Sequence, residues 1–180
     1  MNWTLKTDPS GFQVRWSEEE AAANRAAGYW RESTLVDAAR AAVAEDPSHV
    51  LLIEGDKHLT RGEAWDQASR LASFFLSKGL EPGDVVSLQL PNWMEAQPIA
   101  LAARMCGVII NPIPPIYRDS EMAYILADCG ARMIFIPETF RKHDYRAMIE
   151  KLQPDLPKLT DIIVLRGNGP LTFEQALASP

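Results

Sequence analysis

Four short apolar runs, rich in β-branched residues, recur through the second half of the chain at residues 85–90, 107–110, 133–136 and 162–165. None of them alternates strictly between apolar and polar residues, which is typical of strands that are covered on both faces. We therefore predict four parallel strands in one sheet.

The segments between these runs have the three-to-four residue spacing of apolar positions that helices show. They lie at residues 92–106, 119–128 and 145–152. Each is long enough to connect two parallel strands, and such crossovers are right-handed in nearly all proteins. The predicted fold class is α/β, with a doubly wound, largely parallel sheet.

The chain before this region has a different pattern. The first forty-five residues are helical in pattern, and Ser17 with Glu20 forms a capping box ahead of an alanine-rich stretch. A second helix is predicted over residues 35–44, with Thr34 as its cap. We therefore divide the chain into an N-terminal helical segment, residues 1–46, and an α/β subdomain, residues 47–180.

The α/β subdomain opens with a hairpin and a helix. Residues 50–53 and 58–59 flank a Glu-Gly-Asp-Lys turn, and this pattern predicts two antiparallel strands. Thr60 and Glu63 then form another capping box, and the helix that follows ends at Gly79.

The last ten residues begin another helix. Thr172 and Gln175 again have the capping-box spacing, and the sequence stops inside the helix that they start. We expect an incomplete fragment of a larger fold.

Composition excludes several functions. The 180 residues include 18 Lys plus Arg and 24 Asp plus Glu, a net charge of −6, so there is no basic surface for nucleic acid. The longest apolar run, residues 105–110, is far shorter than the roughly 20 residues that span a bilayer. The N-terminus lacks the pattern of a secretory signal, and two cysteines without metal-ligand spacing favour a reducing, cytoplasmic setting.

The sequence contains little catalytic chemistry. It has no glycine-rich phosphate motif and no Gly-x-Ser-x-Gly elbow, and its three histidines lie in separate segments. Cys106 and Cys129 are interpreted as small buried apolar residues. We predict no catalytic residue and no metal ligand.

One loop is a candidate binding site. Residues 111–119 follow a buried strand, contain three prolines, and present Tyr117 and Arg118 just before a helix. The alternative is that the prolines only shape the crossover, that Tyr117 packs, and that Arg118 pairs with Asp119 or Glu121.

A larger pattern covers the chain from about residue 35 onward. Its residues are Gly79, Pro82-Gly83-Asp84-Val85-Val86, Pro91-Asn92, Gly107, Glu121 and Ile125-Leu126. In this order they resemble the N-terminal region of the adenylate-forming superfamily, the acyl-CoA synthetases and their relatives. The sequences of residues 89–93, 115–118 and 140–145 are most similar to the cyclohexanecarboxylate and fatty-acid CoA ligase branch.

The resemblance implies an ATP-dependent acyl-CoA ligase, which joins a carboxylate to ATP and passes the acyl group from AMP to coenzyme A. ATP, Mg²⁺ and CoA are the cofactors implied for the full-length enzyme, and none is expected to be bound to this fragment. The family's phosphate loop, adenine-binding segment and catalytic lysine have no counterpart here, so we expect the isolated chain to be inactive.

The resemblance also implies partners. They are the remainder of the same ligase chain and a carboxylic acid substrate, and an exposed apolar patch is expected to favour self-association into a homo-oligomer. Family relatives place CoA-contacting surface near residues 111–119. We therefore expect Arg118 to contact the CoA phosphates, with Tyr117 packed beneath it.

Two alternatives remain open. One is an aryl-acid or amino-acid adenylating domain that serves a carrier protein. The other is a stand-alone flavodoxin-like binding module without catalysis.

Overall fold

The structure of the chain is a computed structural model that describes residues 6–7, 11, 13–14 and 16–178. It divides into two units, Met1–Ala38 and Ala39–Pro180, and the boundary falls within helix α2 (Leu35–Glu45). The predicted cap of α2 is confirmed, because Thr34 Oγ1 accepts a hydrogen bond from the Asp37 amide at 3.2 Å.

The first unit contains helix α1 (Glu18–Ala26) and two short strands. The Ser17–Glu20 capping box of α1 is confirmed. Strands β1 (Lys6–Thr7) and β2 (Gln13–Val14) pair antiparallel, so the prediction that the first forty-five residues are helical is wrong for them. Gly11, with φ +85°, adopts the left-handed conformation that allows the chain to reverse between the strands.

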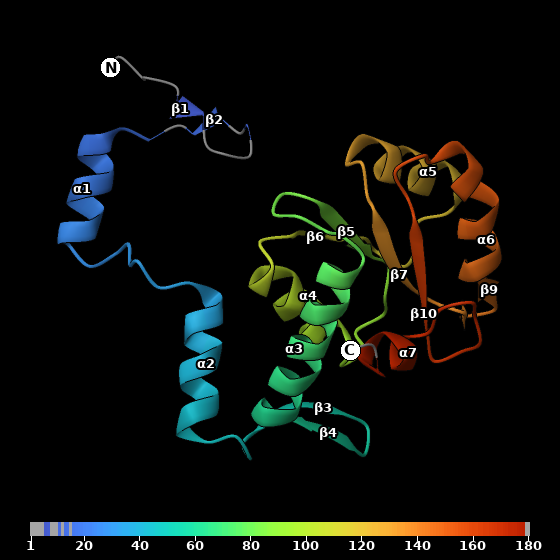
Figure 1. The fold of residues 1–180 in the computed structure, drawn as a ribbon, viewed down its shortest axis with the longest axis horizontal. Helices are drawn as coiled ribbons and strands as arrows, with labels where there is room; N and C mark the ends of the chain where they lie inside the picture. The colour runs from blue at the N-terminus through green and yellow to red at the C-terminus, as the bar shows by residue number, and fades with distance from the viewer. Residues whose placement is uncertain (1–5, 8–10, 12, 15, 179–180) are drawn as a thin grey trace. The chain divides into compact units, whose positions relative to one another are not determined.

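The second unit is built on the predicted parallel sheet (Figure 1), whose strand order is β10-β7-β5-β6. Its strands are β5 (Val85–Leu88), β6 (Ile109–Pro112), β7 (Met133–Pro137) and β10 (Asp161–Leu165). All neighbouring pairs are parallel, as the four apolar runs predicted.

Helices cover both faces of this sheet, as expected for a doubly wound fold (Figure 1). Helices α3 (Arg61–Ser77), α4 (Ala96–Met105) and α7 (Phe173–Ala178) lie on one face, and α5 (Asp119–Asp128) and α6 (Tyr145–Leu152) lie on the other. A 3₁₀ turn, η1 (Gln153–Asp155), follows α6. On the first face, Phe75 of α3 packs edge to face against Phe135 of β7, with ring centroids 6.0 Å apart. On the second, Met122, Leu126 and Ile149 are fully or almost fully buried in one apolar cluster.

Two short hairpins complete the unit. Strands β3 (Val50–Glu54) and β4 (Lys57–Thr60) pair antiparallel around Gly55 and Asp56, as predicted. Strands β8 (Thr139–Phe140) and β9 (His143–Asp144) form the second hairpin directly after β7. The predicted capping boxes of α3 and α7 are present.

Two predicted elements begin two or more residues late in the structure, and strand β5 ends at Leu88 rather than at residue 90. Helix α4 begins at Ala96 rather than at residue 92, because residues 93–95 form tight turns in which the Trp93 amide donates to the Pro91 carbonyl. Strand β6 begins at Ile109 rather than at residue 107. Gly107, with φ +69°, instead lies at the end of α4, in the left-handed conformation that commonly terminates helices.

Candidate functional site

The strand order places a crevice at the carboxyl ends of β5 and β7. From β5 the chain passes first to β6 on one side and then to β7 on the other, so the direction of winding reverses at this point. In open α/β sheets, ligands bind in the crevice outside such a reversal. The loops that follow β5, β6, β7 and β10 all meet at this edge.

A pocket of about 510 Å³ opens among three of these loops. Its lining combines aromatic, aliphatic and cationic side chains and includes no carboxylate. The residues are Pro91, Asn92, Pro115, Ile116, Arg118, Phe140, Arg141 and Tyr145. We call it the cationic pocket, because its lining includes two arginines, whose planar guanidinium groups are suited to anions.

The β8–β9 hairpin carries one of these arginines in a strained turn. Arg141 and Lys142 connect the two strands with φ angles of +50° and +65°. A two-residue turn with positive φ at both positions is the type I′ geometry, which glycine and asparagine normally occupy. Side chains rarely adopt this conformation, and strained backbone of this kind occurs often at functional sites.

The loop over the pocket is fixed by hydrogen bonds to its carbonyl groups. Gln89, which is fully buried at the end of β5, donates from Nε2 to the Pro114 and Tyr117 carbonyls at 3.2 and 3.0 Å. The Tyr145 hydroxyl donates to the Pro115 carbonyl at 2.6 Å. The proline-rich loop is therefore held from below by side chains of two other segments.

Arg118 lies in the cationic pocket, and its contacts are not those of an ion pair with Asp119 or Glu121. Its Nη1 donates to the Pro115 and Tyr117 carbonyls at 2.7 and 2.8 Å. Its guanidinium carbon lies 5.5 Å from the centre of the Tyr145 ring. The ring beneath Arg118 is thus Tyr145 and not Tyr117, whose exposed fraction is 37%.

The carboxylates near Arg118 have other roles. Asp119 forms an ion pair with Lys151 at 2.7 Å. Glu121 accepts a hydrogen bond from the Arg118 backbone amide at 3.2 Å, which caps the start of α5. The guanidinium of Arg118 therefore has no hydrogen bond to either carboxylate among the described residues.

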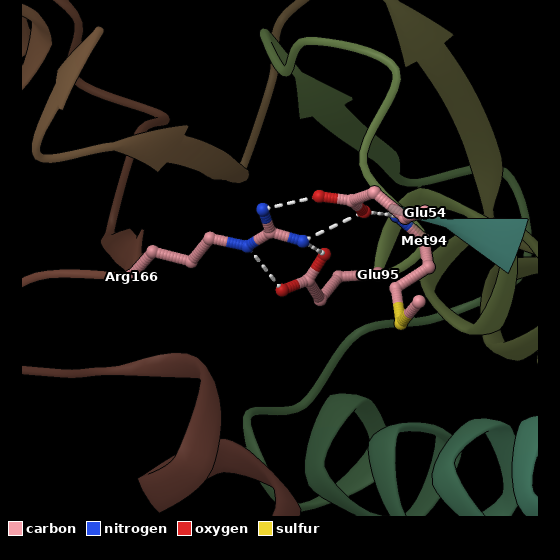
Figure 2. Close-up of polar contacts among 4 residues, drawn as sticks. All are labelled: Glu54, Met94, Glu95 and Arg166. Carbon is pink, nitrogen blue, oxygen red and sulfur yellow. Dashed lines mark hydrogen bonds and ion pairs between the residues drawn. The ribbon is translucent and has the colours of Figure 1, made fainter. Parts of the chain in front are cut away.

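A third arginine, outside the pocket, organises the neighbouring part of the edge. Figure 2 shows Arg166, directly after β10, between the carboxylates of Glu54 and Glu95. Arg166 Nη2 donates to both carboxylates at 2.8 Å, and Nε donates to Glu95 at 2.7 Å. Glu54 also accepts a hydrogen bond from the Met94 amide at 2.9 Å. These contacts tie the β3–β4 hairpin, the start of α4 and the end of β10 together.

Aromatic rings join this arginine to the cationic pocket. The guanidinium carbon of Arg166 lies 4.1 Å from the centre of the Trp93 ring, a close cation–π contact. Trp93 meets Phe140 edge to face, with centroids 6.2 Å apart and an interplanar angle of 85°. We call Arg166, Glu54, Glu95 and Trp93 the Arg166 cluster.

The electrostatics of the cluster follow from these contacts. Hydrogen bonds from Arg166 hold the pKa of Glu54 below its ordinary value of 4.5. Hydrogen bonding to Glu54 raises the pKa of Arg166 in turn. Both groups are therefore charged across the physiological pH range.

Other residues noted in the sequence have structural roles. Burial raises the pKa of the Cys106 thiol, which makes it a poor nucleophile. Gly167 and Gly169 allow close packing, since a Cβ atom on Gly167 would lie 2.3 Å from Glu138 Cβ. In the part of the chain that the structure describes, no three His, Cys, Asp or Glu residues form a metal-binding group, and no helix is long and apolar enough to cross a membrane.

Sequence reasoning identified one arginine of the pocket and missed the other. Arg141 and Lys142 carried a local signal, because two long cationic residues stand in a two-residue hairpin turn without glycine. The Arg166 cluster carried none, because its members come from segments separated by up to 112 residues. Glu54 alone indicated only the edge of a turn.

Comparison with protein families and structures places this fold among known enzymes. A family model described as AMP-binding enzyme matches residues 39–179. The chain is 31% identical over 166 residues to the medium-chain fatty-acid–CoA ligase of Escherichia coli K12, covering 92% of this chain and 29% of that protein. It is 32% identical over 165 residues to the salicyl-AMP ligase / salicyl-S-ArCP synthetase of Mycobacterium tuberculosis, covering 89% and 29%.

Solved structures give the same relationship. The apo structure of Mycobacterium smegmatis MbtA matches with a TM-score of 0.80 and 28% sequence identity, covering 92% of this chain and 31% of that one. The chain thus spans less than a third of the length of these relatives. Since the family model covers most of the chain and the relatives are adenylate-forming ligases, the chain belongs to the AMP-binding enzyme family.

Proposed function

We propose that the chain is the α/β portion of an ATP-dependent acyl-CoA ligase, in which the cationic pocket receives the phosphate groups of coenzyme A. The ligase joins a carboxylate to ATP, releases pyrophosphate, and transfers the acyl group from AMP to the CoA thiol. The observation that carries the proposal is the pocket of about 510 Å³ that Arg118 and Arg141 line at the carboxyl edge of the sheet.

The residues present fit the phosphates of CoA. Among the described residues, Arg118 forms its side-chain hydrogen bonds through Nη1, so Nε and Nη2 are left to donate to a phosphate. Arg141 lines the same pocket, and exposed Lys142 follows it in the turn. Arginine donates two parallel hydrogen bonds to phosphate, and several cations suit a ligand with several phosphates.

The residues present do not fit ATP or Mg²⁺. The described part of the chain has no glycine-rich phosphate loop and no cluster of three acidic or metal-binding side chains. We therefore assign neither group to this chain, and we propose that the 180 residues alone do not exchange pyrophosphate into ATP. Pyrophosphate exchange by the purified chain above a buffer blank would overturn that part of the proposal.

A second function is favoured by one comparison. The similarity to the salicyl-AMP ligase / salicyl-S-ArCP synthetase suggests an aryl-acid adenylating enzyme that delivers its product to a carrier protein. A carrier-bound pantetheine arm presents one phosphodiester, whereas CoA presents a diphosphate and a separate phosphate on its ribose. The two arginines and the lysine beside them favour CoA.

Calorimetric titration of the chain with CoA, dephospho-CoA and pantetheine tests the proposal. Affinity should decrease in that order, because each successive ligand has fewer phosphates. Arg118→Ala should weaken CoA binding by about ten- to a hundredfold, the expected loss of one charge-assisted hydrogen-bonded contact. The control is Arg104→Ala, since the exposed side chain of Arg104 donates to the Ala100 carbonyl on α4 and does not line the pocket. Equal affinities for CoA and pantetheine would rule out phosphate recognition in this pocket.

A further inference from the structure

The Arg166 cluster and the cationic pocket share an aromatic wall. Trp93 contacts the guanidinium of Arg166 and also the ring of Phe140. Phe140 lines the pocket, and its ring centre lies 5.3 Å from the guanidinium carbon of Arg141. A continuous series of contacts therefore runs from Arg166 through two rings to a cation of the pocket.

Arg166 itself cannot bind the anion that the pocket receives. Its side chain forms four hydrogen bonds to the carboxylates of Glu54 and Glu95. A guanidinium has five N–H donors, so only one is left. Two negative charges also surround one positive charge, which disfavours an additional anion. Any effect of Arg166 on the pocket must act through its neighbours.

The paired carboxylates fix the plane of this guanidinium. Two bidentate contacts from different segments hold the group at Glu54 and Glu95, and a flat guanidinium can stack on an aromatic ring where an ammonium cannot. The ring of Trp93 is half-buried beneath it and is oriented by this contact. Because Trp93 and Phe140 meet edge to face, a change in the orientation of Trp93 would change this contact.

The hairpin that carries Arg141 needs such support. Strands β8 and β9 have two residues each, and an isolated hairpin is marginally stable in water even when it is longer. Its turn also contains two residues with positive φ, which are strained. Contacts from outside the hairpin must therefore keep it in place. Phe140 packs against the apolar cluster beneath α5 and α6, His143 packs against Tyr145, and the ring contact between Phe140 and Trp93 is a further support.

We propose that Arg166 is a positioning residue for the cationic pocket, acting through Trp93 and Phe140 to hold the β8–β9 hairpin and its cation Arg141 in place. The ligand half of this inference rests on the proposed function, because it takes CoA as the anion. The structural half concerns the hairpin alone and does not depend on the ligand.

Three variants separate this role from general stability. Arg166→Lys keeps the charge but loses the planar fork and the stacking surface. Trp93→Leu removes both ring contacts and leaves the carboxylates unchanged. The matched control is Arg132→Lys, because Arg132 directly precedes β7, at the amino ends of the strands. Arg132 is 29% exposed against 28% for Arg166, and it likewise binds a carboxylate and lies partly buried.

The first measurement needs no ligand. Amide NMR shifts and hydrogen exchange at residues 139–144 are compared between the wild-type chain and each variant. Arg166→Lys and Trp93→Leu should shift these signals. They should also raise the hydrogen-exchange rates of the Phe140 and His143 amides by about tenfold, beyond any increase that a change in global stability explains. Arg132→Lys should leave the signals and the rates unchanged. Unchanged hairpin signals in Arg166→Lys, or equal changes in Arg132→Lys, would overturn the positioning role.

The second measurement is CoA affinity by calorimetry. Arg166→Lys should weaken CoA binding by about tenfold, and it should have no further effect in a Trp93→Leu background, because both changes interrupt the same series of contacts. Additive losses in the double variant would overturn the route through Trp93. Absence of CoA binding by the wild-type chain would overturn the proposed function and the ligand half, while the hairpin signals would still decide the structural half.

Discussion

The guanidinium of Arg166 forms a bidentate ion pair with the carboxylate of Glu54, which precedes it by 112 residues. Each side chain is 28% exposed. The pair joins the first hairpin of the α/β unit to the end of its last parallel strand. Its loss should therefore weaken the association of the hairpin with the sheet.

Glu54→Gln should therefore destabilise the chain. The amide retains the shape of the side chain and can accept from Arg166, but it loses the charge and one acceptor. We expect the free energy of unfolding to fall by about 1 to 2 kcal/mol, less than for a fully buried pair because water reaches both groups.

The measurement is urea denaturation monitored by circular dichroism. Asp66→Asn is the control. Its partner Arg70 donates from Nε to Asp66 Oδ2 at 2.9 Å, a similar distance, but both side chains are about 60% exposed on α3. This substitution should cost less than about 0.5 kcal/mol. Equal losses in the two variants would show that the Arg166 pair adds no more than an exposed surface pair.

The same pair predicts a dependence on pH. The native pKa of Glu54 lies below its ordinary value of 4.5, because Arg166 donates hydrogen bonds to its carboxylate. Its contribution to stability is therefore complete above about pH 4.5, where the unfolded side chain is also ionised, and is lost as pH falls through the lower native pKa.

Unfolding of the wild-type chain and Glu54→Gln, measured from pH 7 to pH 3, tests this. The difference in their free energies of unfolding should be constant at neutral pH and shrink below pH 4.5. A difference that is independent of pH over this range would mean that the ionisation of Glu54 does not contribute.

The fold was largely predictable from the sequence, for local reasons. The capping boxes at Ser17 and Thr60 each depend on residues only three positions apart. The strands do not alternate between apolar and polar residues, so both of their faces must be covered, whatever their order in the sheet. The boundaries that were wrong depend on backbone geometry. Gly107 belongs to the preceding helix because of its left-handed φ, which an apolar run does not reveal.

The candidate site was less predictable, because it depends on contacts between distant segments. The proline-rich loop indicated Arg118, since a rigid loop after a strand is a local feature. Its contacts could not be predicted, because Gln89 and Tyr145 reach the loop from segments 25 to 30 residues away. The Arg166 cluster requires knowing which strand ends are neighbours.

The turn of the β8–β9 hairpin predicts opposing changes in stability and binding. Arg141 and Lys142 adopt positive φ angles, which strain side-chain-bearing residues by about 1 kcal/mol each. Replacing them with Asn and Gly, the residues that type I′ turns favour, should raise the free energy of unfolding by about 1 kcal/mol. CoA binding should weaken because two cations are lost.

Urea denaturation and calorimetry on the Arg141→Asn, Lys142→Gly variant measure the two effects. The control is Asp56→Asn in the β3–β4 turn. That turn already contains Gly55 and lies outside the pocket. A variant that is more stable and binds CoA as well as the wild type would show that these cations do not contribute to the site.

Gly167 predicts a sensitivity at the end of β10. A Cβ atom there would lie 2.3 Å from Glu138 Cβ, closer than side-chain carbons approach. Gly167→Ala should therefore displace the segment after Arg166 and destabilise the chain by about 1 to 3 kcal/mol. Gly55→Ala, which meets no atom within 4 Å but has φ +59°, controls for backbone strain alone. Thermal unfolding should rank Gly167→Ala as the less stable of the two.

The last prediction concerns Gln89, which is fully buried and donates two hydrogen bonds to the loop over the pocket. Both acceptors have a second donor. The Tyr117 amide also donates to the Pro114 carbonyl at 3.2 Å, and Arg118 also donates to the Tyr117 carbonyl. Among the described residues, Gln89 Oε1 is buried without a hydrogen-bond partner.

Gln89→Leu should therefore cost only about 1 kcal/mol, because neither carbonyl is left without a donor and an unpaired oxygen is removed. Gln89→Glu should cost more at pH 7, by at least about 2 kcal/mol, because it buries a carboxylate against two carbonyl oxygens. Burial raises the pKa of such a carboxyl above that of the unfolded chain, so protonation should restore part of the loss as pH falls. Urea denaturation at pH 7 and pH 4.5 should show the Glu variant approaching the Leu variant in acid, and a gap between them that does not narrow would mean that the loop moves to expose the new carboxylate to water.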